Sequence, residues 1–457
     1  MGWPEARTGD GGRAPFTFSH TLVIGGRVEL GYSLTHPSGE LIELTEVVEL
    51  PFDLPRSAAV DAAVRVLHLV AGVSYYKCVA PVALVIDQLT AAEELLVRAL
   101  YDQGLREFAY RNGYVVPLPV DLVVGDGSGD GARAASVPGS GALVPIGGGK
   151  DSALVAALVP DGTLFAVNPV GAHEHLAAAL GRPLLGARRT LDPRLRDLIA
   201  EGAPNGHVPV TAITSAISVL AAVGLGLGDV LMGIERSADE PSLVTADGVE
   251  VNHQFSKSWA AEQLLRDAFA PTGVRYLSLL RPLTELAIGA GVARRGLAAD
   301  IVSCNRVFTV WNQSTASREQ RPCGECAKCL FTALMVAPSS TPAEVASQYG
   351  RPLLDEAVHV AGVQELWSDE KPFDCVGERL ESAAAVVLLS RTEGWRDQAV
   401  VVALADEAST LLAAAGVDAG SYLDLGPVEV LPEDYREVVA GLAPDLASVP
   451  GLAHASR

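Results

Sequence analysis

Short apolar runs alternate with helix-like stretches between residues 142 and 233. The apolar runs cover 142–146, 164–168, 184–190 and 230–233, and helical spacing occurs at 152–158, around His173 and at 210–223. Strands that alternate with helices are typical of a parallel sheet whose faces the helices cover. We therefore expect an α/β fold with a central parallel sheet. Its expected core residues are Leu143, Val144, Ile146, Phe165, Val167, Val230 and Leu231.

The N-terminal part of the chain has a different pattern. Residues 20–50 alternate between apolar and polar types with turn residues between the runs, which indicates short antiparallel strands. Residues 57–74 and 91–109 have apolar side chains three and four positions apart, which indicates helices. We expect residues 1–124 to form an α+β N-terminal domain, and no chemical motif stands out in them.

The rest of the chain divides by composition. Residues 125–141 are rich in Gly, Ser, Ala and Asp, which is typical of a linker. The central α/β domain is expected to cover 142–338. Residues 339–457 are expected to be mostly helical, although the apolar runs at 383–389 and 400–404 fit a helix or a strand. A length of 457 residues is consistent with about three domains.

The charge and the cysteine content of the chain argue against some classes of function. The chain has 34 basic and 55 acidic residues, a formal charge of −21 that disfavours a nucleic-acid partner. Six cysteines are too few for a secreted disulfide scaffold. The apolar stretch 215–233 contains charged and glycine residues and fits a buried helix that runs into a strand better than a membrane span. We expect a cytoplasmic protein without a membrane partner, and the oligomeric state stays open.

The glycine-rich segment 147–152, Gly-Gly-Gly-Lys-Asp-Ser, lies between an expected strand and an expected helix. Glycines allow a tight turn that points backbone N–H groups at an anion, and the N-terminus of the helix adds a positive dipole. The segment is no Walker A loop, because Asp151 follows Lys150 where Ser or Thr is required. A phosphate-binding loop is favoured over a plain strand-to-helix turn.

Four cysteines have the spacing of a metal site. Cys304, Cys323, Cys326 and Cys329 form the pattern C-x18-C-x2-C-x2-C. Four thiolates suit a closed, structural Zn²⁺ site, and an iron–sulfur cluster and free thiols are the alternatives. Cys78 is expected in the core.

Three polar clusters and one cysteine are further candidates. Each cluster has the alternative of a solvated surface, and the cysteine has the alternative of a buried thiol. The candidates are His207, Glu235, Arg236, Asn252, His253, Gln254, Lys257 and Cys375.

The segment 147–152 resembles the PP-loop of the N-type ATP pyrophosphatases, usually Ser-Gly-Gly-x-Asp-Ser, with Gly147 in place of the first Ser. The resemblance implies that 142–338 is a PP-loop domain that cleaves ATP to AMP and pyrophosphate and adenylylates its substrate. It implies that Asp151 helps to position Mg²⁺. Lys150 could compensate for the missing hydroxyl. The implied nucleotide-binding residues are Gly147, Gly148, Gly149, Lys150, Asp151, Ser152 and Asn168.

Within that superfamily the chain resembles the MurL-type epimerases of UDP-N-acetylmuramoyl-L-alanyl-L-glutamate, on the loop and on segments 252–258, 323–329 and 371–377. The resemblance implies ATP-dependent inversion of the terminal L-glutamate of this UDP-linked muramoyl dipeptide. Adenylylation would acidify the α C–H, and an acid and a base would then move the proton. The candidate catalytic residues are Asp151, Lys150, His253, Lys257 and Cys375. The candidate substrate-binding residues are His207, Glu235, Arg236, Asn252 and Gln254.

Two other functions stay open. One is a different adenylylating PP-loop enzyme, such as a ligase like 7-cyano-7-deazaguanine synthase or a thiolase. The other is a zinc-stabilised nucleotide-binding regulator without turnover.

Overall fold

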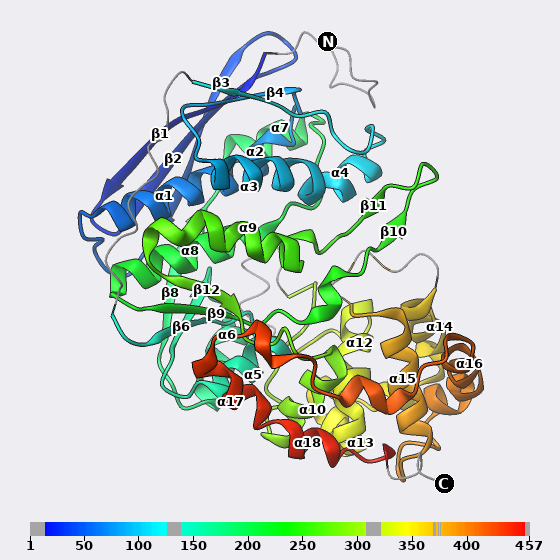
Figure 1. Ribbon diagram of the computed structural model, residues 1–457. Coiled ribbons are helices and arrows are strands. Elements are labelled where there is room, and N and C mark those ends of the chain that lie inside the picture. Colours follow the sequence, from blue (N-terminus) through cyan, green and yellow to red (C-terminus); the bar gives the residue numbers. More distant parts are fainter. Residues whose placement is uncertain are drawn as a thin grey trace. The chain divides into compact units, whose positions relative to one another are not determined.

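The computed structural model describes residues 14–125, 139–307, 321–368, 372, 374 and 376–452 (Figure 1). The chain divides into two compact units. Unit 1 comprises Met1–Leu143, Leu185–Val230 and Val244–Leu277, and unit 2 comprises Val144–Leu184, Leu231–Leu243 and Ser278–Arg457. The predicted α/β class is confirmed. The predicted linker lies for the most part outside the described residues.

Unit 1 contains the N-terminal strands and helices and three further helices. Its elements are β1 (Phe16–Ile24), β2 (Arg27–Thr35), β3 (Leu41–Glu49), α1 (Ala58–Ala71), α2 (Val73–Tyr76), β4 (Ala83–Ile86), α3 (Ala91–Asp102), α4 (Arg106–Arg111), β5 (Asp121–Val124), α7 (Arg194–Ala200), α8 (Val210–Leu225), β11 (Glu250–Val251) and α9 (Trp259–Phe269). The chain passes from one unit to the other within strands. These strands are β6 (Ala142–Pro145), β8 (Leu184–Thr190), β9 (Asp229–Met232), β10 (Leu243–Val244) and β12 (Arg275–Ser278).

The sheet of unit 1 mixes both strand orientations. Its strands follow the order β8-β3-β2-β1-β4-β5, antiparallel from β8 to β1 and parallel from β1 to β5. β6 and β9 pair in parallel, with Leu143 opposite Val230. On β2, Val28, Leu30, Tyr32 and Leu34 are all buried. Every second side chain of a strand points to the same face, so this alternation explains the sheet's buried face.

Helices cover the buried face of this sheet. α1 contacts β1, β2, α3 and α8, and α3 contacts α9; Figure 1 shows these helices beside one another. Ser57 caps the N-terminus of α1, where its hydroxyl accepts a hydrogen bond from the Val60 N–H at 3.2 Å. Thr90 and Glu93 form a capping box at the start of α3. These caps satisfy N–H groups that a helix leaves unpaired at its N-terminus.

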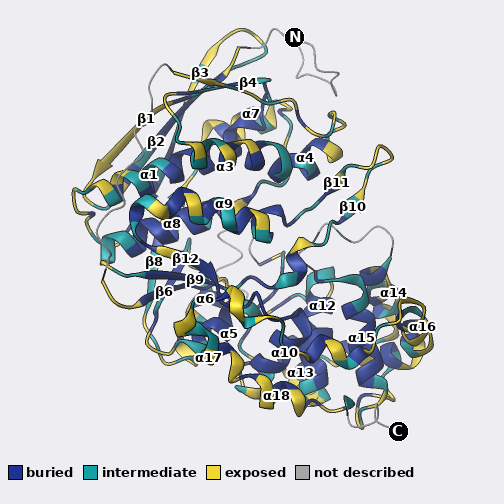
Figure 2. Ribbon diagram, in the orientation of Figure 1, coloured by how far each residue is buried: buried dark blue, intermediate teal, exposed yellow. Residues whose placement is uncertain are grey.

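Unit 2 contains β7 and most of the C-terminal helices. Its elements are α5 (Lys150–Leu158), β7 (Thr163–Val167), α6 (Gly171–Ala179), α10 (Glu285–Arg294), α12 (Ala327–Val336), α13 (Pro342–Tyr349), α14 (Val360–Gln364), α15 (Arg379–Ser390), α16 (Ala399–Ala415), α17 (Glu433–Ala440) and α18 (Ala443–Ala447). α10 packs against α5 and α12, and Figure 2 shows that α10, α12 and α15 are largely buried.

Most of the predicted elements are confirmed. The apolar runs 383–389 and 400–404, left open between helix and strand, lie in the helices α15 and α16. The core residues are buried as predicted, except that Val167 is only partly buried. Cys78 is buried, as expected. The helix after the glycine segment begins at Lys150 rather than Ser152, so Lys150, Asp151 and Ser152 all lie in its first turn.

One helical stretch, Ala58–Tyr76, is long and apolar enough to cross a membrane, and 72% of its most apolar window is buried inside the protein. The helix pair Ala399–Ala415 and Ala419–Val430 reaches that length only as a broken span, bent by 87°. A buried core helix has the same composition as a short membrane span. The stretch 215–233 forms part of α8 and then β9, as predicted.

A buried ion pair connects two strands of unit 1. The Arg189 guanidinium donates from Nε and Nη2 to the two carboxylate oxygens of Glu46, at 2.6 and 3.0 Å, and Glu46 is fully buried. We predict that Arg189→Ala lowers the free energy of unfolding by about 3–5 kcal/mol, because it leaves a buried carboxylate without its partner. Urea denaturation followed by circular dichroism measures the change.

Arg27→Ala is the matched control. Arg27 pairs with Glu29 and Glu49 at the surface, so its loss is expected to change stability little. Equal effects of the two substitutions would contradict this account.

Candidate functional site

The glycine segment of unit 2 forms a loop at the N-terminus of α5. Gly148 has a φ of +76°, a backbone conformation that favours glycine. The Gly147 N–H donates to the Ser152 hydroxyl at 3.1 Å, and that hydroxyl donates to the Gly149 carbonyl at 3.2 Å. A Cβ added to Gly147 would meet no atom within 4 Å. The loop therefore has open space beside the N-terminus of a helix, which suits an anion.

The Lys150 side chain does not point into solvent. Its ammonium group forms ion pairs with Asp151 and Glu285, and only 3% of the residue is exposed. Burial alone would lower the pKa of Lys150, but the carboxylates of Asp151, Glu285 and Glu235 outweigh it and raise that pKa. Lys150 is therefore charged at neutral pH. Its positive charge is directed at carboxylates of the protein.

Three further acidic side chains lie buried near Lys150 in unit 2. Glu235 follows β9, Glu285 begins α10 and Glu381 lies on α15, with exposed fractions of 1%, 4% and 0%. Burial raises the pKa of Glu381 to about 8, and burial also raises the pKa of Glu285. The Leu286 N–H donates to Glu381 at 2.7 Å. Sequence analysis missed Glu285 and Glu381 because an acidic residue in an apolar helix has no distinctive spacing.

The four predicted cysteines lie together. The Sγ atoms of Cys304, Cys323, Cys326 and Cys329 all lie within 4.8 Å of one another. Cys329 Sγ lies 3.8 Å from that of Cys323 and 3.5 Å from that of Cys326. A tetrahedral zinc site with Zn–S bonds of about 2.3 Å has Sγ atoms about 3.8 Å apart. The four residues therefore fit a closed zinc site, in which every ligand position is taken by a thiolate.

One short segment connects the cysteine site to the glycine loop. The Val302 N–H donates to the Gly148 carbonyl at 2.7 Å. A Cβ on Gly149 would lie 2.8 Å from the Ser303 hydroxyl. Cys304, a member of the cysteine site, comes next in the chain. A metal that holds Cys304 would thus also hold the segment against which the loop packs.

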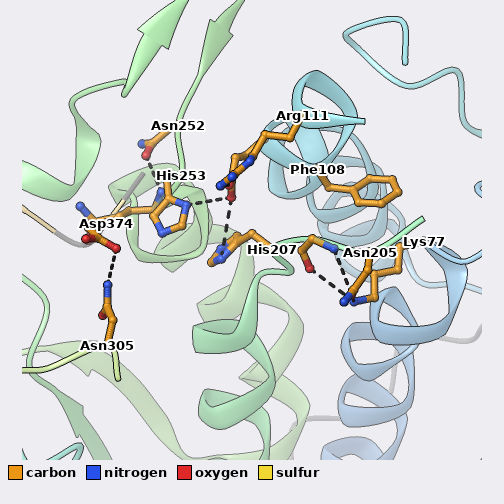
Figure 3. A network of polar contacts seen from close by, with 12 residues as sticks. Lys77, Phe108, Arg111, Asn205, His207, Asn252, His253, Asn305 and Asp374 are labelled. Atoms are coloured by element: carbon orange, nitrogen blue, oxygen red, sulfur yellow. Dashed lines mark hydrogen bonds and ion pairs between the residues drawn. The ribbon is translucent and has the colours of Figure 1, made fainter. Parts of the chain in front are cut away.

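Unit 1 contains a second cluster, formed by Glu107, His207 and His253 (Figure 3). Nδ1 of His253 lies 2.8 Å from Oε2 of Glu107, and Nδ1 of His207 lies 3.9 Å from the same oxygen. The two imidazole rings are tilted by 41° with their centroids 4.1 Å apart. Burial and the neighbouring His253 lower the pKa of His207 to about 4, so this ring is neutral at pH 7.

Glu107 is the functional candidate that sequence analysis missed. It lies on α4, is 3% exposed, and accepts a hydrogen bond from Arg111 at 3.4 Å. Burial tends to raise the pKa of Glu107, but His253, His207 and Arg111 together lower it, so the carboxylate is charged. Its helix, Arg-Glu-Phe-Ala-Tyr-Arg, has a common mixed composition, so no sequence signal marked Glu107. Only the folded chain brings residue 107 to residues 207 and 253.

The N-terminal part of unit 1 also positions the segment that precedes α8. The Lys77 ammonium donates to the Asn205 side chain and, at 3.3 Å, to the Gly206 carbonyl. The Asn112 amide donates to the Asn205 carbonyl at 3.1 Å. These bonds hold the backbone immediately before His207 (Figure 3).

The turn before α9 brings together the remaining unit 1 candidates. The Asn252 side chain accepts from the Gln254 N–H at 2.7 Å, and the Lys257 ammonium donates to the Gln254 side chain at 3.2 Å. Ser258 caps α9 by accepting from the Ala261 N–H at 3.1 Å. The polar sequence 252–258 is therefore a hydrogen-bonded turn that presents His253 to Glu107.

The other predicted residues are more dispersed. Arg236 begins a short helical turn after β9, and its N–H donates to the Leu283 carbonyl at 3.3 Å. Asn168 follows β7 with a φ of +50°. Cys375 lies outside the described residues. Its neighbour Gly377 packs closely against Glu285, because a Cβ there would lie 2.8 Å from Cγ of Glu285.

The fold and these clusters define a class of protein: an α/β protein with a glycine-rich loop at a helix N-terminus, buried carboxylates beside it and four clustered cysteines that could hold a metal ion. The chain belongs to the MurL family. The family model of the MurL N-terminal domain matches residues 16–279, and that of the MurL C-terminal domain matches residues 300–418.

Curated relatives agree with this assignment. A protein of Salinispora tropica is 39% identical over 93% of this chain and 95% of its own length, and one of a Micromonospora species is 40% identical over 93% and 97%. One of Xanthomonas oryzae is 40% identical over 79% and 82%. All three are named UDP-N-acetyl-alpha-D-muramoyl-L-alanyl-L-glutamate epimerase. No solved structure matches the chain. The chain is an enzyme of the isomerase class, an epimerase.

We predict that purified protein contains one zinc ion per chain and that Cys326→Ser loses it. The loss is expected to lower the melting temperature and to weaken nucleotide binding, because Cys304 holds the segment under the loop. Elemental analysis, differential scanning fluorimetry and nucleotide titration measure the three effects.

Cys78→Ser is the control, since Cys78 is buried away from the cysteine site and its substitution should leave the zinc content unchanged. Iron in place of zinc, or unchanged nucleotide affinity after zinc loss, would contradict this assignment.

Proposed function

We propose that this chain inverts the α-carbon of the terminal L-glutamyl residue of UDP-N-acetylmuramoyl-L-alanyl-L-glutamate, in the cytoplasm and at the expense of ATP. The observation that carries the proposal is the 39–40% identity, over most of the chain, to relatives named as epimerases of this substrate. The loop at the N-terminus of α5 and the histidine–glutamate cluster of unit 1 support the two halves of the chemistry.

The first half of the proposed reaction is the activation of the substrate carboxylate. A C–H bond beside a carboxylate is a weak acid, because its carbanion would form next to a negative charge. We propose that a carboxylate oxygen attacks the α-phosphorus of ATP, that the bond to pyrophosphate breaks, and that pyrophosphate leaves. The resulting acyl-adenylate has no charge on the acyl group, so its α C–H is far more acidic.

The PP-loop resemblance assigns the nucleotide to the glycine loop. The backbone N–H groups of Gly148 and Gly149 suit phosphate oxygens at a helix N-terminus. Gly147 and Ser152 shape the loop through their hydrogen bonds and stay proposed nucleotide contacts. Asp151 fits a Mg²⁺ ion that accompanies the phosphates, because its carboxylate lies in the first turn of the same helix. Asn168 remains a proposed nucleotide contact.

Proton transfer is the second half. We propose that His253 removes the α-proton and that Glu107 is its positioning residue, which holds Nδ1 so that Nε2 can accept the proton. A proton then returns from the opposite face, and water cleaves the acyl-adenylate. The overall reaction consumes one ATP and one water and forms AMP, pyrophosphate and the D-glutamyl product.

The histidine pair cannot supply both proton-transfer groups. Groups on opposite faces of a carbon, each about 3–3.5 Å from it, are about 6–7 Å apart. The imidazole centroids of His207 and His253 are only 4.1 Å apart, so no substrate carbon fits between them. His207 is then a substrate-binding residue, as are Asn252 and Gln254. Lys257 and Cys375 remain the candidates for the opposite face.

We predict that the protein, given ATP, Mg²⁺ and the L-alanyl-L-glutamyl nucleotide, forms AMP and D-glutamate in equal amounts. Asp151→Asn is expected to lower AMP formation at least about 100-fold, because a metal-binding charge at the phosphates is lost. Chiral analysis of the hydrolysed product and AMP quantification measure both. AMP without D-glutamate would indicate another adenylylating enzyme, and binding of ATP without any AMP would indicate a regulator.

We predict that His253→Gln keeps the exchange of labelled pyrophosphate into ATP but loses deuterium incorporation at the α-carbon in heavy water about 10²–10⁴-fold. Glu107→Gln should do the same to a smaller extent and shift the pH profile of deuterium incorporation, because Glu107 acts through His253.

His175→Gln is the matched control, since His175 pairs with Asp300 in unit 2 and should change neither readout. Loss of pyrophosphate exchange in His253→Gln would overturn the assignment of this residue to proton transfer.

A further inference from the structure

Three carboxylates converge beside the glycine loop of unit 2. They belong to Asp151 in the first turn of α5, Glu235 after β9 and Glu285 at the start of α10. One oxygen of each lies within 4.8 Å of the others. The three residues come from positions up to 134 apart in the chain, so the convergence is a product of the fold. It is compact enough for one ion to contact all three.

Glu235 is the most unusual of the three. Only 1% of the residue is exposed, and neither of its carboxylate oxygens has a hydrogen-bond partner among the described residues. The Arg281 guanidinium donates to the backbone carbonyl of Glu235 at 2.9 Å rather than to its carboxylate. A buried carboxylate without a hydrogen-bond donor is strongly unfavourable.

The neighbouring cation does not balance this charge. Lys150 carries one positive charge and forms its ion pairs with Asp151 and Glu285. Glu381, fully buried, adds a further acidic group near Glu285, and its Oε2 also lacks a hydrogen-bond partner among the described residues. The cluster therefore has more buried acidic groups than a single ammonium can neutralise, and a second positive charge would stabilise it.

We propose that Asp151, Glu235 and Glu285 form a divalent-cation site that fills in the absence of nucleotide, and that the Lys150 ammonium competes with the cation for it. An all-oxygen set of carboxylates suits a hard cation such as Mg²⁺ or Mn²⁺. The PP-loop resemblance assigns Mg²⁺ to Asp151 alone, as a companion of the phosphates. The two buried glutamates supply two further protein ligands, so the proposed site does not need phosphate oxygens.

The competition follows from the position of Lys150. Its ammonium contacts two of the three proposed ligands, so a divalent ion and the ammonium repel each other and share the same oxygens. Occupation of the site therefore weakens the ion pairs of Lys150 and leaves its charge available to another anion. Removal of the Lys150 charge should in turn strengthen cation binding. The site does not depend on the identity of the acid substrate, and its test needs no turnover.

The experiment is a titration of the full-length protein with Mn²⁺ alone, without nucleotide, followed by electron paramagnetic resonance of free Mn²⁺. The wild type is expected to bind one Mn²⁺ per chain, displaced by Mg²⁺. Glu235→Gln and Glu285→Gln should each weaken this binding about tenfold or more, since affinity follows the charge of the ligands. Lys150→Met should strengthen it. Binding by neither the wild type nor Lys150→Met would overturn the proposal.

Two controls separate this site from others. Glu393→Gln removes an exposed acidic residue of unit 2 and should leave Mn²⁺ binding unchanged. Glu107→Gln removes the carboxylate of the histidine cluster and should also leave it unchanged. A loss of binding in Glu107→Gln but not in Glu235→Gln would move the cation to unit 1 and overturn the proposal, while the epimerase reaction could still stand.

Thermal stability provides a second readout. Without a divalent ion, Glu235→Gln should raise the melting temperature, because it removes one of several buried acidic groups that crowd around a single ammonium. Addition of Mg²⁺ should stabilise the wild type and leave Glu235→Gln nearly unchanged. A Glu235 that served only the packing of the fold would instead lose stability in both conditions, which would contradict a role in cation binding.

Discussion

The buried ammonium of Lys150 is the interaction on which unit 2 depends. It pairs the first turn of α5, through Asp151, with the start of α10, through Glu285. A charged group that is 3% exposed is tolerable only when opposite charges surround it. The first turn of α5 and the start of α10, which are far apart in the sequence, must therefore stay close to this one ammonium group. The glycine loop gains a defined geometry as a consequence, since Lys150 is the first residue of the helix that the loop begins.

The four-cysteine site has a related structural role. It does not offer an open coordination position, so its contribution is to hold the chain and not to react. The segment 302–304 has the loop on one side, through the Val302 bond to Gly148, and a cysteine of the site at its end. The cysteine cluster and the glycine loop are thus connected by three residues. A metal ion held by the four cysteines would also hold the segment against which the loop packs.

The two halves of the proposed reaction have different physical requirements, and each unit meets one of them. Adenylylation needs backbone donors and cations around phosphate groups, and unit 2 has a helix N-terminus, Asp151 and buried carboxylates. Proton transfer needs a group that is held in orientation, and in unit 1 Nδ1 of His253 lies 2.8 Å from the charged Glu107 carboxylate. His207 stays neutral beside them because its pKa is lowered to about 4 by burial and by its neighbour.

The sequence by itself determined the local features. Period and spacing predicted most strands and helices, the tight glycine turn before a helix, and the four cysteines that converge, because these depend on neighbouring residues and on short motifs. Whether the apolar runs at 383–389 and 400–404 were helix or strand could not be decided from the sequence, since apolar runs fit both.

Only the tertiary structure decided the long-range pairs. It brought Glu107 to His253, paired Lys150 with Glu285, and buried Glu235 where no described residue donates to its carboxylate. Single acidic residues in apolar helices have no periodicity or spacing that marks them. Their function depends on which distant groups packing brings within a few ångströms, and that is a property of the folded chain alone.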